Sequence, residues 1–192
     1  WNKGLSYRER HGLGHKGTNE GIHTNVGDTL HTDRNASKHS LGLVFFPAFD
    51  WKISETHPER QERLLYTRDQ IVEEGLLDIP NIKEYNPIVA DWDTIERVHV
   101  GAPDLESWVT EAHRVSAGGA IAAADAVMRG EVDRAFALVR PPGHHAMAMV
   151  HGIRGFCTIN IEAVMIQHMR QTYGIKRVAV VDTDVHHGDG SQ

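Results

Sequence analysis

The sequence predicts an α/β domain in which a mainly parallel β-sheet is flanked by helices. Three observations support this fold class. Apolar runs at 41–46, 135–139 and 178–181 indicate buried strands. Amphipathic or Ala-rich stretches that separate these runs are typical of covering helices. Finally, polar clusters that contain His and Asp follow the second and third runs, at the strand ends where open α/β sheets place their chemistry.

Local signals predict the elements in order. We expect a first strand at 41–46, and Pro58 with Thr56 as a cap predicts a helix from Glu59 to Leu77. The further elements expected are a short strand or connection at 81–86, a capped helix at 93–96, helices at 103–113 and 116–129, a strand at 134–139, a helix at 161–173 and a last strand at 178–181. The final strand, helix and strand form a βαβ crossover, which places both polar loops at one edge of the sheet.

The loop after the last predicted strand carries alternating Asp and His residues. If the backbone stays extended, the two-residue period of a strand sends Asp182, Asp184 and His186 to one side. Carboxylate oxygen and imidazole nitrogen are suitable ligands for a divalent ion such as zinc, and Gly188 and Gly190 permit a tight turn around it. The alternative is a solvated polar loop that follows a core strand.

A second polar cluster, Pro141-Pro142-Gly143-His144-His145, follows the strand expected at 134–139. The two prolines fix the backbone and present the adjacent histidines from a stiff loop. Since the unperturbed pKa of histidine lies near neutrality, such a pair suits acid–base catalysis beside a metal. The alternative is a pair of loop histidines without a catalytic role.

These motifs carry a family resemblance. The segments 141–146, Gly155-Phe156-Cys157 with Asn160, and 182–190 together resemble the histone deacetylase superfamily, which includes class II type deacetylases and bacterial acetylpolyamine amidohydrolases. The resemblance extends upstream to 56–60 and 98–99. It implies an arginase/deacetylase-like fold that is incomplete in this chain, and hydrolysis of N-acetyl lysine or acetylpolyamine amides to acetate and a free amine.

The resemblance also implies roles for particular residues. His145 takes a proton from water with His144 as its partner, while Asp182 pairs with His144 and Asp189 pairs with His145. Asp184 and His186 are expected to hold zinc, although ferrous iron accepts the same donors. The same stretch resembles the potassium site of the family, which uses Asp182, Asp184 and His186. Gly155 and Phe156 are expected to line the acyl tunnel.

The sequence departs from the family pattern in two places. The third metal ligand of the family, an Asp, and its transition-state Tyr or His lie well beyond the Asp-x-His motif, and this sequence stops at Gln192. We therefore expect the N-terminal part of a longer deacetylase, with the remainder absent, cleaved or supplied as a second chain, and an isolated piece that is unstable and inactive. The loop between His99 and Ser116 is short, and Asp104 is its candidate for the substrate-binding acidic residue of the family.

Composition bears on partners and compartment. A net charge of −6 without a long basic run argues against direct nucleic-acid binding and favours a cationic substrate. The single cysteine, Cys157, excludes an intrachain disulfide and indicates a buried thiol in a reducing compartment. No apolar run approaches the ~20 residues that span a bilayer. No signal-peptide core is present, so we expect a cytoplasmic protein without membrane contact.

We expect residues 1–40 to form a loop-rich N-terminal segment and residues 41–192 to form the N-terminal portion of a single deacetylase-type domain. The first segment contains five histidines whose spacing fits no zinc finger, so a rim or partner-contact role is expected for it: His11, His15, His23, His31 and His39. A homo-oligomer is a further candidate assembly. Two other functions remain as alternatives, namely a non-catalytic acyl-lysine-binding module and an arginase-like ureohydrolase.

Overall fold

The computed structural model describes residues 38–100, 109–149 and 153–192. The elements in this part of the chain are β1 (Leu41–Phe46), α3 (Gln61–Glu73), the 3-10 helix η1 (Leu76–Asp78), β2 (Ile82–Tyr85), α4 (Trp92–Glu96), α6 (Glu111–Met128), β3 (Arg134–Val139) and α7 (Ile161–Tyr173). No helix in these ranges is both long enough and apolar enough to cross a bilayer.

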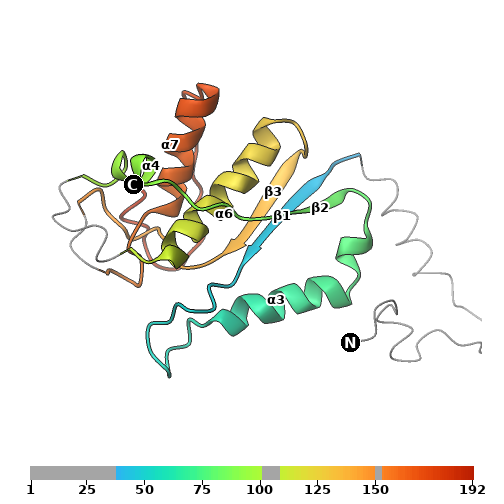
Figure 1. The fold of residues 1–192 in the computed structure, drawn as a ribbon, viewed down its shortest axis with the longest axis horizontal. Coiled ribbons are helices and arrows are strands. Elements are labelled where there is room, and N and C mark those ends of the chain that lie inside the picture. The colour runs from blue at the N-terminus through green and yellow to red at the C-terminus, as the bar shows by residue number, and fades with distance from the viewer. Residues whose placement is uncertain (1–37, 101–108, 150–152) are drawn as a thin grey trace, which may run out of the picture.

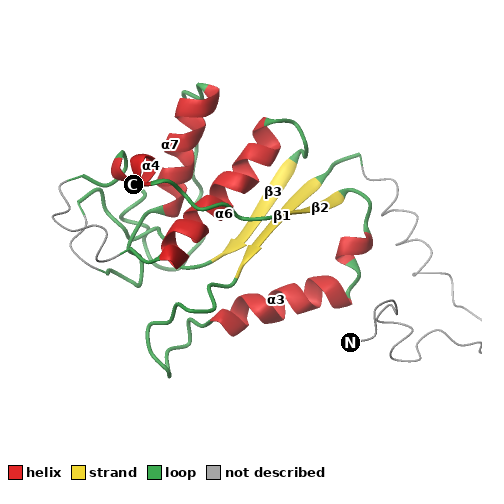
Figure 2. Cartoon of the chain, in the orientation of Figure 1, coloured by secondary structure: helices red, strands yellow, loops and turns green. Residues whose placement is uncertain are grey.

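The sheet has the strand order β2-β1-β3, and both strand pairs are parallel. Parallel neighbours need a crossover connection, and α3 lies in the connection from β1 to β2. Helix α6 packs on β1 and β3 and also contacts α7 (Figure 1). In the same view α3 lies on the other side of the strands from α6 and α7 (Figure 2). The α/β architecture with a parallel sheet is therefore confirmed.

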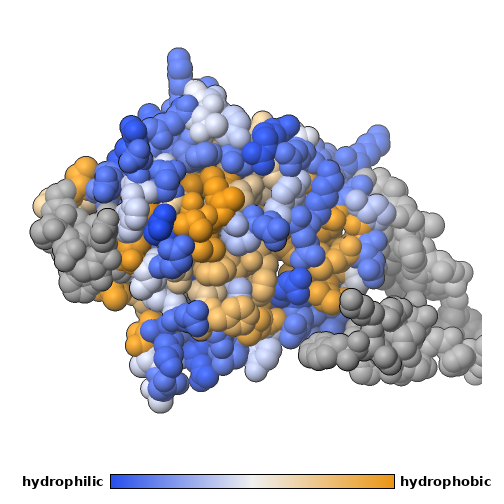
Figure 3. Space-filling view, in the orientation of Figure 1, coloured by the Kyte–Doolittle hydropathy of each residue, from blue (hydrophilic) through white to orange (hydrophobic). Residues whose placement is uncertain are grey.

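The core forms where α6 meets the strands and α7. Val44 of β1 packs with Ala122 and Ala123 of α6. Gly118 and Gly119 let α6 approach closely, because a Cβ at Gly118 would lie 1.9 Å from the carbonyl oxygen of Ile88. On the face of the molecule that is seen in Figure 3, apolar residues gather near the middle and polar residues surround them.

Three elements have the bounds that local signals predict, namely β1, β3 and α7. Helix α7 is the clearest case. The side chain of Asn160 accepts a hydrogen bond from the backbone N–H of Ala163 at 2.9 Å, and Gly174 ends the helix in the left-handed conformation with φ 67°. These two caps are the standard start and stop signals of a helix.

Some predicted helix boundaries are wrong. Helix α3 begins at Gln61 rather than Glu59, because a buried ion pair with Arg140 holds the Glu59 side chain and its backbone N–H donates to His57 Nδ1. A single helix, α6, begins at Glu111 and continues through position 116, where the sequence predicts the start of a separate helix. A capping box between Thr110 and His113 starts α6 at Glu111.

The predicted last strand is also wrong. Residues 174–183 contain no strand, and Val180 and Val181 are 47% and 85% exposed. A strand needs a neighbouring backbone for its hydrogen bonds, and among the described residues this run has no pairing partner in the sheet. The expected βαβ crossover is therefore not completed within the described residues.

Several predictions fall on residues that the structure does not describe. The loop-rich segment 1–40 lies outside the described residues except for 38–40, and Asp104 lies outside them as well. The start of the helix expected at 103–113 is likewise outside this part of the chain.

Candidate active site

The loop that carries the two histidines is anchored by a buried arginine at the end of β3. The Arg140 side chain is 2% exposed, and its Nη2 lies 2.7 Å from Glu59 Oε2. Its guanidinium also donates hydrogen bonds to the carbonyl oxygens of Pro47 and Ala48 and lies over the Trp51 ring at 4.9 Å. A buried charge is tolerated when all its donors are satisfied in this way. The ion pair thus fixes the segment from which the histidines project.

The next residues of the loop pack against helices. Ser116 Oγ of α6 donates a hydrogen bond to the carbonyl oxygen of Pro141 at 2.7 Å. A Cβ at Gly143 would lie 2.4 Å from the backbone nitrogen of Ile161, so only glycine allows the loop to lie against the start of α7. The stiff loop that the Pro-Pro-Gly run predicts is therefore held on both helices.

Two His–Asp pairs lie side by side at the centre of the site. His144 Nδ1 is 2.8 Å from Asp182 Oδ2, and His145 Nδ1 is 2.8 Å from Asp189 Oδ1. The two imidazole centroids are 4.1 Å apart. The hydrogen bonds expected from the family resemblance are thus present. The two polar clusters meet although the last predicted strand does not form.

Electrostatics keep both carboxylates charged. The hydrogen bond with His144, followed by the backbone N–H of Asp184, lowers the pKa of Asp182. The hydrogen bond with His145 lowers the pKa of Asp189, with a further contribution from the charge of Arg154, against an opposing effect of burial. A charged carboxylate on Nδ1 orients the imidazole and stabilises its protonated form. This is the arrangement that a general base needs.

A buried histidine joins the loop to helix α7. His99 Nδ1 lies 2.8 Å from the carbonyl oxygen of Met147, and its Nε2 accepts a hydrogen bond from the backbone N–H of Asn160 at 3.0 Å. Burial lowers the pKa of His99, and the two contacts together require the neutral Nδ1–H tautomer. The motif 98–99 that extends the family resemblance upstream is therefore a structural connection.

Asn160 connects the two polar loops to one another. Its Nδ2 donates hydrogen bonds to Ser191 Oγ at 3.0 Å and to the carbonyl oxygen of Ala146 at 3.3 Å. In addition, the backbone N–H of Gly190 donates to the carbonyl oxygen of His144 at 2.9 Å. These bonds hold the Asp-containing loop against the His-His loop.

One predicted tunnel residue, Gly155, lies against the second histidine, and the other, Phe156, lies against His57. Gly155 has φ +50°, and a Cβ there would lie 2.3 Å from His145 Cδ2. The ring of Phe156 contacts that of His57 at 5.2 Å between centroids, so the helix-entry loop also reaches this point. Cys157 is buried, and burial raises its pKa to about 11. The prediction of a buried thiol is confirmed.

The proposed metal ligands are adjacent and exposed. His186 Nδ1 lies 3.0 Å from Asp184 Oδ1, and the centroid of the His186 ring is 6.2 Å from that of His145. One carboxylate and one imidazole fit zinc in kind, but zinc takes at least three protein ligands. The described ranges contain no group of three or more His, Cys, Asp or Glu side chains arranged to hold a metal. Zinc, and potassium at Asp182, Asp184 and His186, therefore stay predictions.

A cavity of about 460 Å³ lies beside the first pair. It is lined by Pro142, Gly143, His144, Glu162, Val180, Val181, Asp182, Thr183, Asp184 and Ser191. Burial raises the pKa of Glu162, and its Oε2 has no hydrogen-bond partner in the part of the chain that the structure describes. Glu162 and Arg154 were missed by sequence reasoning, since each stands alone in an ordinary helix start or loop.

Comparisons with known proteins show which family this chain resembles. Residues 103–192 match the histone deacetylase domain family. A probable deacetylase of Archaeoglobus fulgidus is 38% identical over 170 residues, which are 79% of this chain and 46% of the relative. The mouse polyamine deacetylase HDAC10 is 33% identical over 157 residues, covering 82% and 19% of the two chains.

A solved structure also resembles this chain. The crystal structure of the HDA15 HD domain is similar with a TM-score of 0.66 and 28% sequence identity, over 80% of this chain and 49% of that one. This chain thus spans less than half the length of the relatives described. The chain has part of the fold of a deacetylase domain.

Proposed function

Because the chain belongs to the histone deacetylase superfamily, we propose that it carries part of an active site that hydrolyses N-acetyl amides to acetate and a free amine. The observation that carries this proposal is the pair of adjacent histidines, His144 and His145, each bonded through Nδ1 to its own carboxylate. This arrangement leaves both Nε2 atoms available for proton transfer.

In the proposed reaction His145 Nε2 accepts a proton from water as the water oxygen bonds to the acyl carbon. The resulting tetrahedral intermediate then breaks its C–N bond, and the nitrogen takes up the proton from His145 to leave as an amine. His144 stabilises charge beside it as the partner acid. Asp182 and Asp189 hold the two rings in the required tautomer and stabilise the protonated state.

We propose that Asp184 and His186 contribute two ligands to a zinc ion, with further ligands from residues outside the described ranges. Ferrous iron is the alternative. The metal would polarise the acyl carbonyl and acidify the bound water. Potassium is proposed at Asp182, Asp184 and His186, as the family resemblance implies.

The proposed substrates are N-acetyl lysine in a peptide and acetylated polyamines. The net charge of −6 favours a cationic substrate over nucleic acid or a membrane surface. Gly155 and Phe156 are proposed to line the channel for the apolar stem of the substrate. The remainder of a deacetylase domain is the proposed partner, and the cytoplasm is the proposed compartment.

The test measures acetate release from an acetyl-lysine peptide and from acetylspermidine, using the full-length protein loaded with zinc. We expect Asp184→Ala and His186→Ala to lose bound metal, and His145→Ala to keep the metal and lose turnover. Zinc retained in both ligand variants would contradict the metal assignment. Peptide binding without acetate release would instead favour the non-catalytic acyl-lysine-binding alternative.

A further inference from the structure

The turn that carries the predicted tunnel residues also carries an arginine in contact with the site. Arg154 Nη2 lies 2.6 Å from Asp189 Oδ2, and the other oxygen of this carboxylate is 2.8 Å from His145 Nδ1. We propose that Arg154 is a positioning residue, which holds Asp189 and through it His145 in the orientation required for proton transfer. This inference rests on the proposed function.

The contact constrains the carboxylate at both oxygens. The terminal torsion of an Asp side chain is soft, so a single hydrogen bond leaves the carboxylate free to rotate about it. In this site one oxygen of Asp189 bonds His145 and the other bonds Arg154, which fixes the plane of the group. Arg154 Nη1 also lies 3.7 Å from Met147 Sδ, a second contact that limits the movement of the guanidinium.

The backbone turn that begins at Arg154 contacts the opposite side of the His145 imidazole. Arg154 and Cys157 exchange two backbone hydrogen bonds of 3.1 and 2.8 Å, which close the turn between them. Gly155 at the tip of this turn lies against His145 Cδ2. One short turn therefore contacts the ring directly through Gly155 and indirectly through Asp189. The position of His145 depends on both contacts.

The neighbouring pair lacks this cation. Among the described residues Asp182 has an ion pair with His144 and none with Lys or Arg, and its second oxygen accepts the backbone N–H of Asp184. The arginine is thus specific to the histidine that the proposed reaction uses as its base. Because the Arg154 side chain is 61% exposed, its removal is expected to alter orientation more than fold stability.

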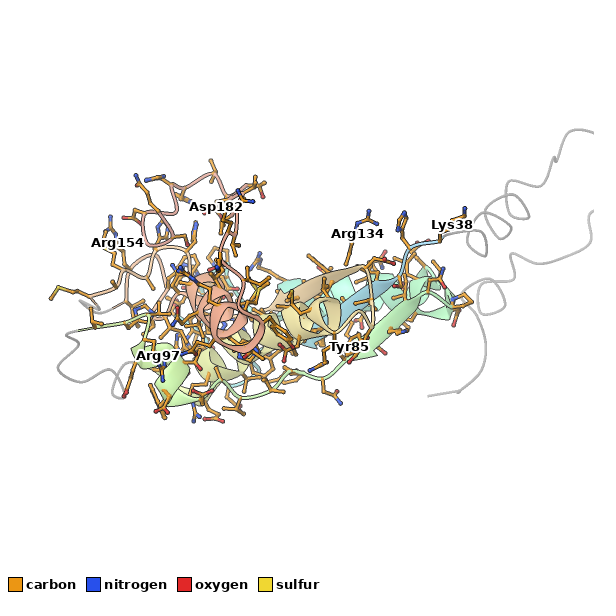
Figure 4. The ribbon with its side chains drawn as sticks, turned by 90° about the horizontal axis from the view of Figure 1, so that it is seen from above. Lys38, Tyr85, Arg97, Arg134, Arg154 and Asp182 are labelled. Atoms are coloured by element: carbon orange, nitrogen blue, oxygen red, sulfur yellow. The ribbon has the colours of Figure 1, made fainter. Side chains whose placement is uncertain are left out.

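The kinetic test compares Arg154→Met and Arg154→Lys with Arg134→Met in the full-length, zinc-loaded protein. Figure 4 shows Arg154 and Asp182 at one end of the molecule and Arg134 towards the other, so the control removes the same charge far from the site. For Arg154→Met we expect kcat to fall about tenfold, with KM unchanged. Lys keeps the charge, so Arg154→Lys should lose less, and Arg134→Met should match the parent protein.

A second readout does not need turnover. The Nδ1 protons of His144 and His145 are each hydrogen-bonded to a carboxylate, and their downfield proton NMR signals can be assigned with Asp182→Asn and Asp189→Asn. We expect Arg154→Met to shift or broaden the His145 signal and to leave the His144 signal unchanged. If the parent protein shows no hydrolysis, the proposed function fails, whereas the NMR comparison still decides the role of Arg154.

Three results would overturn the inference. The first is an unchanged kcat together with an unchanged His145 signal in Arg154→Met. The second is a raised KM with an unchanged kcat, which would make Arg154 a substrate contact at the rim. The third is loss of the circular-dichroism spectrum in both Arg154→Met and Arg154→Lys, which would make its role structural.

Discussion

The two His–Asp pairs have the same chemistry and different surroundings. Both imidazole side chains are 16% exposed, but the carboxylate of Asp182 is 32% exposed and that of Asp189 is 18% exposed. The difference therefore lies in what supports each carboxylate. Asp182 accepts a hydrogen bond from the backbone N–H of Asp184 and borders a cavity. Asp189 instead forms an ion pair with Arg154, in the turn that also carries Gly155 and Phe156.

This difference indicates distinct tasks for two adjacent residues of the same type. The pair of His145 has contacts that fix its geometry on both sides, as a group that moves a proton requires. The His144–Asp182 pair and Glu162 line the same cavity, and Glu162 Oε2 has no hydrogen-bond partner among the described residues, a setting suited to an electrostatic role. Four predictions concern the two His–Asp pairs and the fold that supports them.

Separate replacement of the histidines should have the largest effect. His145→Ala is expected to lower kcat by about 10²–10⁴-fold, as loss of a general base does. His144→Ala should lose less, because the role proposed for His144 is electrostatic. Acetate release and metal content, both measured on the full-length protein, check this. Equal losses in the two variants would remove the functional distinction between the pairs.

Loss of the common anchor should affect both pairs together. Arg140→Met removes the buried partner of Glu59, leaves the exposed Arg63 as its ion pair, and should lower the free energy of unfolding by about 3–5 kcal/mol. Arg63 binds the same Glu59 but is 58% exposed, so Arg63→Met is the matched control, with an expected cost below about 1 kcal/mol. Urea unfolding followed by circular dichroism measures both. Similar costs would contradict the assignment of Arg140 as the anchor.

Added methyl groups should disturb one pair at a time. A Cβ at Gly155 would meet His145 Cδ2, and a Cβ at Gly188 would lie 2.1 Å from Asp182 Oδ2, so each Ala variant should shift only its own Nδ1 proton signal. We expect each to cost about 1–3 kcal/mol. Gly130→Ala is the control for backbone strain alone, since Gly130 has φ +70° and nothing within 4 Å.

Acid should act on the fold in two separate pH ranges. Burial lowers the pKa of His113 to about 4, below the unfolded value, so the stability it contributes is present above pH 6.5 and is lost as pH falls towards 4. The pKa values of Asp182 and Asp189 are also lowered, so their contribution is lost only as pH falls below the ordinary Asp value of about 4. Unfolding free energies measured from pH 3 to 7 check this. Replacement of both Asp residues by Asn should lessen the loss of stability in the lower range and leave the upper range unchanged.

Much of the fold follows from local sequence signals. The run 41–46 and the run 134–139 are strands because short apolar runs with aromatic or β-branched residues favour buried strands wherever a parallel partner exists. The start of α3 could not be predicted, because Arg140 lies 81 residues from Glu59 and leaves no local trace there. The run 178–181 has every local mark of a strand, yet pairing requires a neighbouring backbone that the described residues do not place beside it.

The sequence by itself determined the chemical groups of the site and their order along the chain. His144, His145, Asp182 and Asp189 stand in motifs whose residue types are visible without a structure. Only the tertiary structure decided that Arg154 contacts Asp189 and that the two carboxylates differ in their support. The reason is physical, because the ion pair between Arg154 and Asp189 depends on how the whole loop packs, and no short-range preference encodes it.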